Sequence, residues 1–226
     1  MIICDSSSII ALNETCNSNV FHFLQELDFV IPPAVEEEIV INPIKVKQFA
    51  MHALRMQMIL REKEVRIVSK KNLEERTEKV LRFANNSYFI DGKPLTLVQR
   101  GEAACLALLS LVGARLLLID EKTTRMILED PLALQRIIQE EHGKKVKLNS
   151  ENLKRLSEMF DGAAILRSTE LITIAARKGF FARFEEDETK AYHAAIYALR
   201  FAGCSITTQE LSDYDELDVS PPFLKG

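Results

Sequence analysis

Residues 2–12 read IICDSSSIIAL: a short apolar run, an aspartate, three serines and a second apolar run. Continuous apolar runs of this kind are typical of strands that are buried on both faces of a parallel sheet. Four more apolar runs follow, at residues 29–31, 65–68, 116–119 and 163–166, and they are mostly continuous, with Arg66 inside the second of these. Segments with helical patterns lie between them, which predicts an α/β domain whose mainly parallel sheet of five strands is flanked by helices.

Apolar residues at helical spacing mark the connecting segments. One such stripe lies in residues 73–84, a second in residues 45–63 and a third in residues 191–202. Each stripe is wide enough to cover one face of a helix. A further helix is predicted to begin near Ser168 and to close at Gly179, where glycine suits a helix end.

Two segments do not fit this simple alternation. Residues 126–160 are long for one crossover, and Gly143 followed by Ser150 as a helix cap divides them into two predicted helices. Residues 205–226 carry five acids and a Pro-Pro pair, and we expect an irregular acidic tail there. The predicted organisation is therefore one domain over residues 1–204, with a helical insertion at 126–160, followed by the tail.

Composition excludes several classes of protein. The chain has 226 residues, of which 47% are hydrophobic and 27% charged, as in ordinary soluble domains. The longest apolar stretch, residues 103–119, is too short and too interrupted to span a membrane, and the start lacks a secretory signal. The four cysteines are far apart and form no zinc or disulfide pattern. We expect a cytoplasmic protein with no membrane partner.

Charge is distributed unevenly along the chain. Residues 1–44 contain seven acids and no Lys or Arg, whereas residues 45–82 contain eleven basic residues and five acids. A net charge of -4 can therefore coexist with a basic face that attracts a polyanion. The alternative is an ordinary solvated helix surface of mixed charge.

Acidic and hydroxyl side chains follow the predicted strands. Asp5 ends the first strand, Asp120 ends the fourth and is followed by Glu121, and the pair Ser168-Thr169 follows the last. Ligands of open α/β sheets bind beyond the carboxyl ends of the strands, so these residues are candidates for one shared site. Each aspartate taken alone is equally well explained as a helix cap.

Two further acids come from predicted helices. In the triplet Glu36-Glu37-Glu38, helical geometry turns Glu37 towards solvent and leaves either Glu36 or Glu38 able to reach a site. Glu102 opens a largely apolar helix, and the helix dipole alone is enough to explain an acid there.

Four carboxylates gathered at one sheet edge would need a compensating cation, because like charges raise one another's pKa. Oxygen ligands without a Cys/His cluster favour Mg²⁺ or Mn²⁺ over Zn²⁺. Such ions serve phosphoryl chemistry by activating water and stabilising a leaving oxygen.

The order of these motifs resembles the PIN domain family of metal-dependent nucleases. The matching pieces are IICDSSSIIAL, VIPPAVEEEIV, GEAACLALL, LLLIDEKTTR and AAILRSTELITIAARKGF, in family order over residues 1–180. The resemblance implies a three-layer α/β/α fold and a Mg²⁺- or Mn²⁺-dependent endoribonuclease that leaves a 5'-phosphate and a 3'-hydroxyl. It also implies RNA as substrate and, in toxin-like members, an antitoxin as protein partner; homodimers are common in the family.

The resemblance assigns roles residue by residue. Asp5, Glu102 and Asp120 match the metal-binding acids, Glu38 matches the catalytic acid that completes the cluster and orients the attacking water, and Ser7 matches the hydroxyl beside the metal.

Five other residues receive supporting roles. Glu121 stands where the family often has a second Asp, and it is expected, together with Ser168 and Thr169, to position water or metal ligands. Arg125 and Lys122, which follow Asp120, are expected to contact the RNA backbone.

Departures from the family pattern keep other interpretations open. The insertion and the tail are absent from compact toxins, and the zinc ribbon of some ribosome-maturation members is missing. One alternative is a catalytically inactive PIN-like RNA-binding or assembly scaffold. A second is a phosphoacceptor or nucleotide-binding domain, which the lack of a Gly-rich phosphate loop argues against. The acidic tail is either a solubilising end or a segment that shields the basic face.

Overall fold

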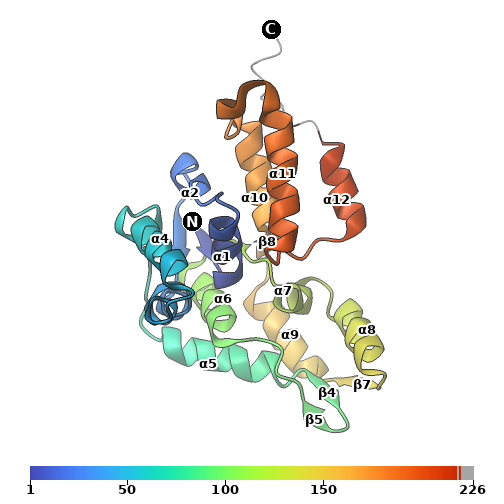
Figure 1. Cartoon of the computed structure of the whole chain (residues 1–226). Coiled ribbons are helices and arrows are strands. Elements are labelled where there is room, and N and C mark those ends of the chain that lie inside the picture. Colours follow the sequence, from blue (N-terminus) through green and yellow to red (C-terminus); the bar gives the residue numbers. More distant parts are fainter. Residues whose placement is uncertain (218, 220–226) are drawn as a thin grey trace.

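The computed structural model describes residues 1–217 and 219, with a parallel five-stranded sheet at its centre (Figure 1). The strand order is β3-β2-β1-β6-β8. All five strands lie where the apolar runs predict them, which confirms the α/β class: β1 (Ile2–Cys4), β2 (Phe29–Ile31), β3 (Val65–Ile67), β6 (Leu116–Leu118) and β8 (Ala164–Leu166).

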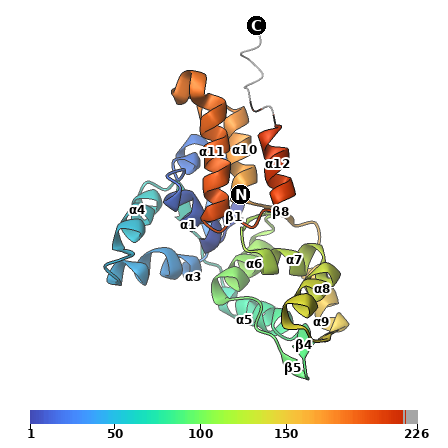
Figure 2. The same cartoon turned by 45° about the vertical axis from the view of Figure 1, so that its right-hand side comes forward.

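Helices connect the strands and cover both faces of the sheet. α6 (Arg100–Val112) packs against β1 and β6 with α5 (Leu73–Ala84) behind it. On the other side lie α1 (Ser6–Glu14), α10 (Ser168–Arg177) and α11 (Glu188–Phe201) (Figures 1 and 2). This arrangement is consistent with the expected three-layer α/β/α fold. The helices up to the insertion are α1 (Ser6–Glu14), α2 (Val20–Phe23), α3 (Pro33–Glu36), α4 (Ala50–Arg61), α5 (Leu73–Ala84) and α6 (Arg100–Val112).

Local sequence explains where several helices begin and end. α3 starts with Pro33 at a position where a missing backbone N–H costs nothing, and it continues as a π-helical turn over Glu37–Ile41. The predicted helix over 45–63 is shorter, because Pro43–Lys45 forms a separate 3₁₀ turn before α4. α10 (Ser168–Arg177) begins and ends as expected, followed by Gly179 with a positive φ of 91°.

The insertion holds both predicted helices and also a strand. These helices are α8 (Pro131–His142) and α9 (Ser150–Met159), preceded by α7 (Lys122–Glu129). The cap of α9 is Asn149 and not Ser150, since the Asn149 side chain accepts a hydrogen bond from the Asn152 N–H. Between α8 and α9, β7 (Val146–Leu148) pairs antiparallel with β4 (Tyr88–Ile90), which also pairs with β5 (Lys93–Pro94). The sequence did not predict this second sheet.

The expectation of an irregular tail is wrong for its first half. α12 (Thr208–Asp215) follows α11 (Glu188–Phe201) as a separate rod (Figures 1 and 2). It is held at its start by a capping box in which Thr207 accepts from the Glu210 N–H while Glu210 accepts from the Thr207 N–H. The Pro-Pro pair and residue 218 lie outside the described residues, so the expectation for them stays a prediction.

In the part of the chain that the structure describes, none of the helices is both long enough and apolar enough to cross a bilayer. The core is one continuous cluster that includes the central strands, α6, Tyr88 of β4 and side chains of the insertion such as Leu156.

Candidate functional site

Asp5 and Asp120 lie at the carboxyl ends of the neighbouring strands β1 and β6, and both side chains are 1% exposed. The Ser7 hydroxyl joins them. It donates a hydrogen bond to Asp5 Oδ2 at 2.7 Å and accepts one from the Asp120 backbone N–H at 3.2 Å. The Ser7 N–H also donates to Asp5 Oδ2, at 3.0 Å, so Asp5 caps α1. The two strand-end acids therefore belong to one hydrogen-bonded unit.

Glu38 and Glu102 approach Asp5 from two other elements. The Glu38 carboxyl group lies against Gly101, with its Cδ 2.7 Å from the place that a side-chain Cβ on Gly101 would occupy. The negative charge of Glu38 raises the pKa of Asp5, and the charge of Asp5 raises that of Glu102. Glu37 is exposed, as helical geometry predicts. Of the two acids left open in the triplet, Glu38 is the one whose charge acts on Asp5.

Burial and like charge together make these acids hard to ionise. Burial is the main cause that raises the pKa of Asp5 to about 6, with Glu38 adding to it and the hydrogen bonds from Ser7 opposing it. Burial likewise raises the pKa of Glu102 to about 7, with contributions from Asp5 and Glu121. Among the described residues, the charged groups that most affect the pKa values of Asp5 and Glu102 are acids, and they raise both values.

Glu102 also has a structural task. Its Oε2 accepts hydrogen bonds from the Gln99 N–H at 2.8 Å and from the Thr124 hydroxyl at 3.0 Å, and the first of these closes the capping box of α6. The cap explanation is therefore correct as far as it goes. It does not account for the bond from Thr124, which ties α6 to α7.

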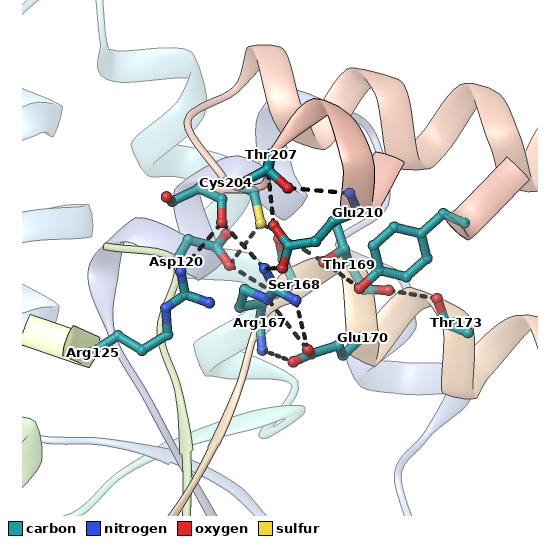
Figure 3. Close-up of polar contacts among 12 residues, drawn as sticks. Asp120, Arg125, Arg167, Ser168, Thr169, Glu170, Thr173, Cys204, Thr207 and Glu210 are labelled. Carbon is teal, nitrogen blue, oxygen red and sulfur yellow. Dashed lines mark hydrogen bonds and ion pairs between the residues drawn. The ribbon is translucent and has the colours of Figure 1, made fainter. Parts of the chain in front are cut away.

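The Asp120 carboxylate is bonded on the side of the site formed by α10 and the segment that leads into α12 (Figure 3). Its Oδ1 accepts a hydrogen bond from the Ser168 N–H at 2.8 Å and from the Cys204 thiol at 3.3 Å. Its Oδ2 is buried and has no hydrogen-bond partner within residues 1–217 and 219. An unsatisfied buried carboxylate oxygen is rare and indicates a missing ligand or a strained arrangement.

The three residues expected to position water are used in different ways. Glu121 caps α7 by accepting from the Thr124 N–H at 2.6 Å. Ser168 contacts Asp120 through its backbone N–H and not through its hydroxyl. The buried Thr169 hydroxyl accepts a hydrogen bond from the Tyr214 phenol at 3.1 Å, which brings the C-terminal segment into the same network (Figure 3).

The two expected RNA contacts differ in accessibility. Lys122 is exposed. The Arg125 side chain is only 16% exposed, and its Nη2 donates to the Ser205 carbonyl at 3.5 Å. Arg125 is therefore partly covered by the chain itself.

Sequence reasoning missed Arg167, Cys204 and Glu210. Arg167 is nearly buried between Glu170 and Glu210. Burial disfavours its charge, but the hydrogen bonds to both acids outweigh this effect and raise its pKa. The pattern Thr207-x-x-Glu210 was the available signal, because it is a capping box that predicts a helix in the supposed tail.

The cluster has oxygen donors but no assembled metal cage. Among the described residues, no group of three or more His, Cys, Asp or Glu side chains is arranged to hold a metal ion. The donors themselves are carboxylate oxygens, which suit Mg²⁺ or Mn²⁺. Asp120 Oδ2, which lacks a partner, is the oxygen best placed to accept a new ligand.

Comparisons with protein-family models, with curated proteins and with solved structures each gave no match to this chain. The likeness to the PIN family therefore depends on the order of the sequence motifs alone.

Proposed function

We propose that this chain is a metal-dependent endoribonuclease that hydrolyses RNA phosphodiester bonds at Asp5, Glu38, Glu102 and Asp120. The single observation that carries the proposal is the burial of Asp5 beside two other acids, Glu38 and Glu102, at the sheet edge where α/β proteins bind ligands. A site whose carboxyl groups resist ionisation has a physical reason to bind a divalent cation.

Each acid has a part in this proposal. Asp5, Glu102 and Asp120 would hold Mg²⁺ or Mn²⁺, and Glu38 would orient the attacking water. When bound, the ion supplies an activated water and stabilises the leaving oxygen. Ser7 keeps Asp5 and Asp120 in register, since its hydroxyl is bonded to both residues.

One observation favours the alternative of a non-catalytic scaffold. The described residues contain no ready-made metal cage, and Glu102 and Glu121 are both engaged as helix caps. A scaffold would keep these caps and bind RNA without cutting it, so cleavage and binding must be measured separately.

The decisive experiment is cleavage of a labelled single-stranded RNA in the presence of Mn²⁺. We expect Asp5→Asn and Asp120→Asn to lower the rate by about 100-fold or more, because each removes a ligand of the proposed ion. Glu37→Gln is the matched control, since it neutralises an exposed acid next to Glu38 and should leave the rate within about twofold. Cleavage that persists in both Asn variants would rule out this site.

Thermal unfolding with and without Mn²⁺ separates the nuclease from the scaffold. Binding to the folded state raises the melting temperature, so the wild type should gain stability on addition of Mn²⁺ and Asp5→Asn should gain less. RNA binding without cleavage, together with no Mn²⁺ effect, would establish the scaffold instead.

A further inference from the structure

Two guanidinium groups meet a single backbone carbonyl beside Asp120. Arg125 Nη2 lies 3.5 Å and Arg167 Nη1 lies 3.3 Å from the Ser205 oxygen. The Arg125 Nε is buried and makes no hydrogen bond among the described residues, and its nearest carboxylate oxygen, on Glu129, is 4.0 Å away. Arg125 therefore leaves much of its hydrogen-bonding capacity unused.

Arg167 divides its donors between a local acid and a distant segment. Its Nε and Nη2 donate to Glu170 Oε1 on its own helix at 3.2 Å and 2.9 Å, which fixes the orientation of the guanidinium plane. Its Nη1 donates two hydrogen bonds to residues 203–215, which we call the C-terminal segment. The acceptors are the Ser205 carbonyl and, at 2.6 Å, Glu210 Oε1 (Figure 3 shows Glu210 beside Arg167). A carboxylate and a second oxygen on one guanidinium edge resemble the oxygens of a phosphate group.

The C-terminal segment reaches the proposed catalytic acids as well as the arginines. The Ser205 N–H donates to the Asp120 carbonyl at 3.4 Å, and the Cys204 thiol donates to Asp120 Oδ1. The segment therefore covers Asp120 on one side of the site. Under the proposed function, RNA that binds beside Asp120 would compete with the segment for this space.

α12 itself contributes little apolar packing to the core, whereas Cys204 and Ile206 in the stretch before it are buried. Leu211 is the buried residue of α12, and a cavity of about 230 Å³ lies beside the guanidinium, lined by Arg167, Glu210, Asp213, Tyr214 and Leu217. α12 stands beside α10 and α11 as an outer rod (Figures 1 and 2). Elements with few buried apolar contacts open at low free-energy cost.

We propose that Arg167 and Arg125 form a binding site for a phosphate of the RNA backbone, and that the C-terminal segment occupies this site in the structure. The inference rests on the proposed function for the identity of the ligand. Glu210 stands in for the phosphate on Arg167, and the segment has to move away before the RNA backbone can reach both arginines. Asp213 and Asp215 add negative charge to the same segment, which opposes an approaching RNA strand while the segment is docked.

The test measures RNA affinity in the full-length chain carrying Asp5→Asn, so that binding is observed without cleavage. The probe is a short labelled single-stranded RNA, and binding is followed by fluorescence anisotropy at several salt concentrations. Glu210→Gln should raise the affinity about threefold to tenfold at low salt, because it releases Arg167 while keeping the size of the side chain. Leu211→Ala should also raise it, since it loosens α12 without touching either arginine.

Matched variants separate this effect from a general change in charge. Glu216→Gln removes the same charge from an exposed position at the end of α12 and should change the affinity by less than about twofold. Adding Arg167→Gln to Glu210→Gln should cancel the gain and reduce the slope of log affinity against log salt by about one. Arg167→Lys should restore only part of the affinity, because lysine lacks the planar fork.

Two results would overturn the inference: Glu210→Gln and Leu211→Ala binding RNA no more tightly than Glu216→Gln, or no variant binding RNA. The first result would mean that the Arg167–Glu210 ion pair only stabilises the fold. The proposed function is judged separately, by Mn²⁺-dependent cleavage in the wild type against Asp5→Asn. Tighter RNA binding by Glu210→Gln and Leu211→Ala, with no Mn²⁺-dependent cleavage by the wild type, would refute the nuclease proposal and support the phosphate site.

Discussion

Ser7 is the residue that holds the two strand-end acids together. Its hydroxyl satisfies Asp5 Oδ2 and the buried N–H of Asp120 at the same time. We expect Ser7→Ala to lower the free energy of unfolding by about 1–3 kcal/mol, because it leaves the Asp120 N–H without a partner. Chemical denaturation checks this, with Ser6→Ala as the control; equal losses in the two variants would contradict the linking role.

The protonation of Asp5 makes stability depend on pH. Its pKa is about 6 in the folded chain against an ordinary value of 3.8, so the folded state holds the proton more tightly than the unfolded state. This contribution is fully present below pH 4 and is lost as the pH rises through about 6. The loss amounts to on the order of 2–3 kcal/mol for a group so deeply buried.

Asp5→Asn should remove this dependence. In EDTA, we expect the variant to be more stable than the wild type at pH 8 and to lose that advantage at pH 4, as measured by denaturant titration at both values. The free energy of unfolding of the wild type and that of Asp5→Asn should therefore depend on pH differently. An equal change in both proteins between pH 4 and pH 7 would contradict the predicted effect of Asp5.

At the scale of elements, the sequence predicts the five parallel strands because four are continuous apolar runs and β3 is interrupted only by Arg66. The small sheet escapes prediction, since Lys147 interrupts β7, and its pairing joins segments far apart in the chain. α12 escapes for a different reason. Its acids suggest disorder, whereas Leu211, Tyr214 and the Thr207 capping box give it a packed side and a defined start.

Some residues of the candidate site are predictable from the sequence and others are not. Strand ends and helix geometry predict that Asp5, Glu102 and one of Glu36 and Glu38 come together, and only the family resemblance selects Glu38. The place of Arg167 is not, because its partners Ser205 and Glu210 depend on how a segment about 40 residues later folds back.

The start of α6 offers a test that separates capping from chemistry. Glu102→Gln keeps the side chain that completes the capping box, so its stability should lie within about 0.5 kcal/mol of the wild type or above it. Glu102→Ala removes the cap and should cost about 1 kcal/mol. RNA cleavage should fall in both variants. Full activity in Glu102→Gln would show that Glu102 is only a cap.

Gly101 permits the close approach of Glu38 to α6. A Cβ at this position would collide with the Glu38 carboxyl group, which sits at the end of a flexible side chain and can move aside. We therefore expect Gly101→Ala to fold, helped by a helix propensity gain of about 1 kcal/mol, but to lose RNA cleavage about tenfold or more. Glu38→Gln is the comparison variant. An active Gly101→Ala would show that the position of Glu38 is not critical.

At the scale of the whole molecule, the insertion and the main sheet share one core. Leu156 of α9 is 1% exposed and belongs to the same apolar cluster as the central strands. Leu156→Ala should cost about 2–4 kcal/mol and keep a single unfolding transition when circular dichroism and tyrosine fluorescence are compared. Two separate transitions would mean that the insertion unfolds by itself.

The strand nearest the N-terminus, β1, is the middle of the sheet, paired through Ile2 with Phe29 on one side and with Leu116 on the other. During synthesis its first neighbour, β2, emerges soon after it, but its second, β6, arrives only once Leu116–Leu118 has been made. Until then one flank of an apolar strand stays open to water and to other chains. Such a topology slows folding and exposes the nascent strand to wrong pairing.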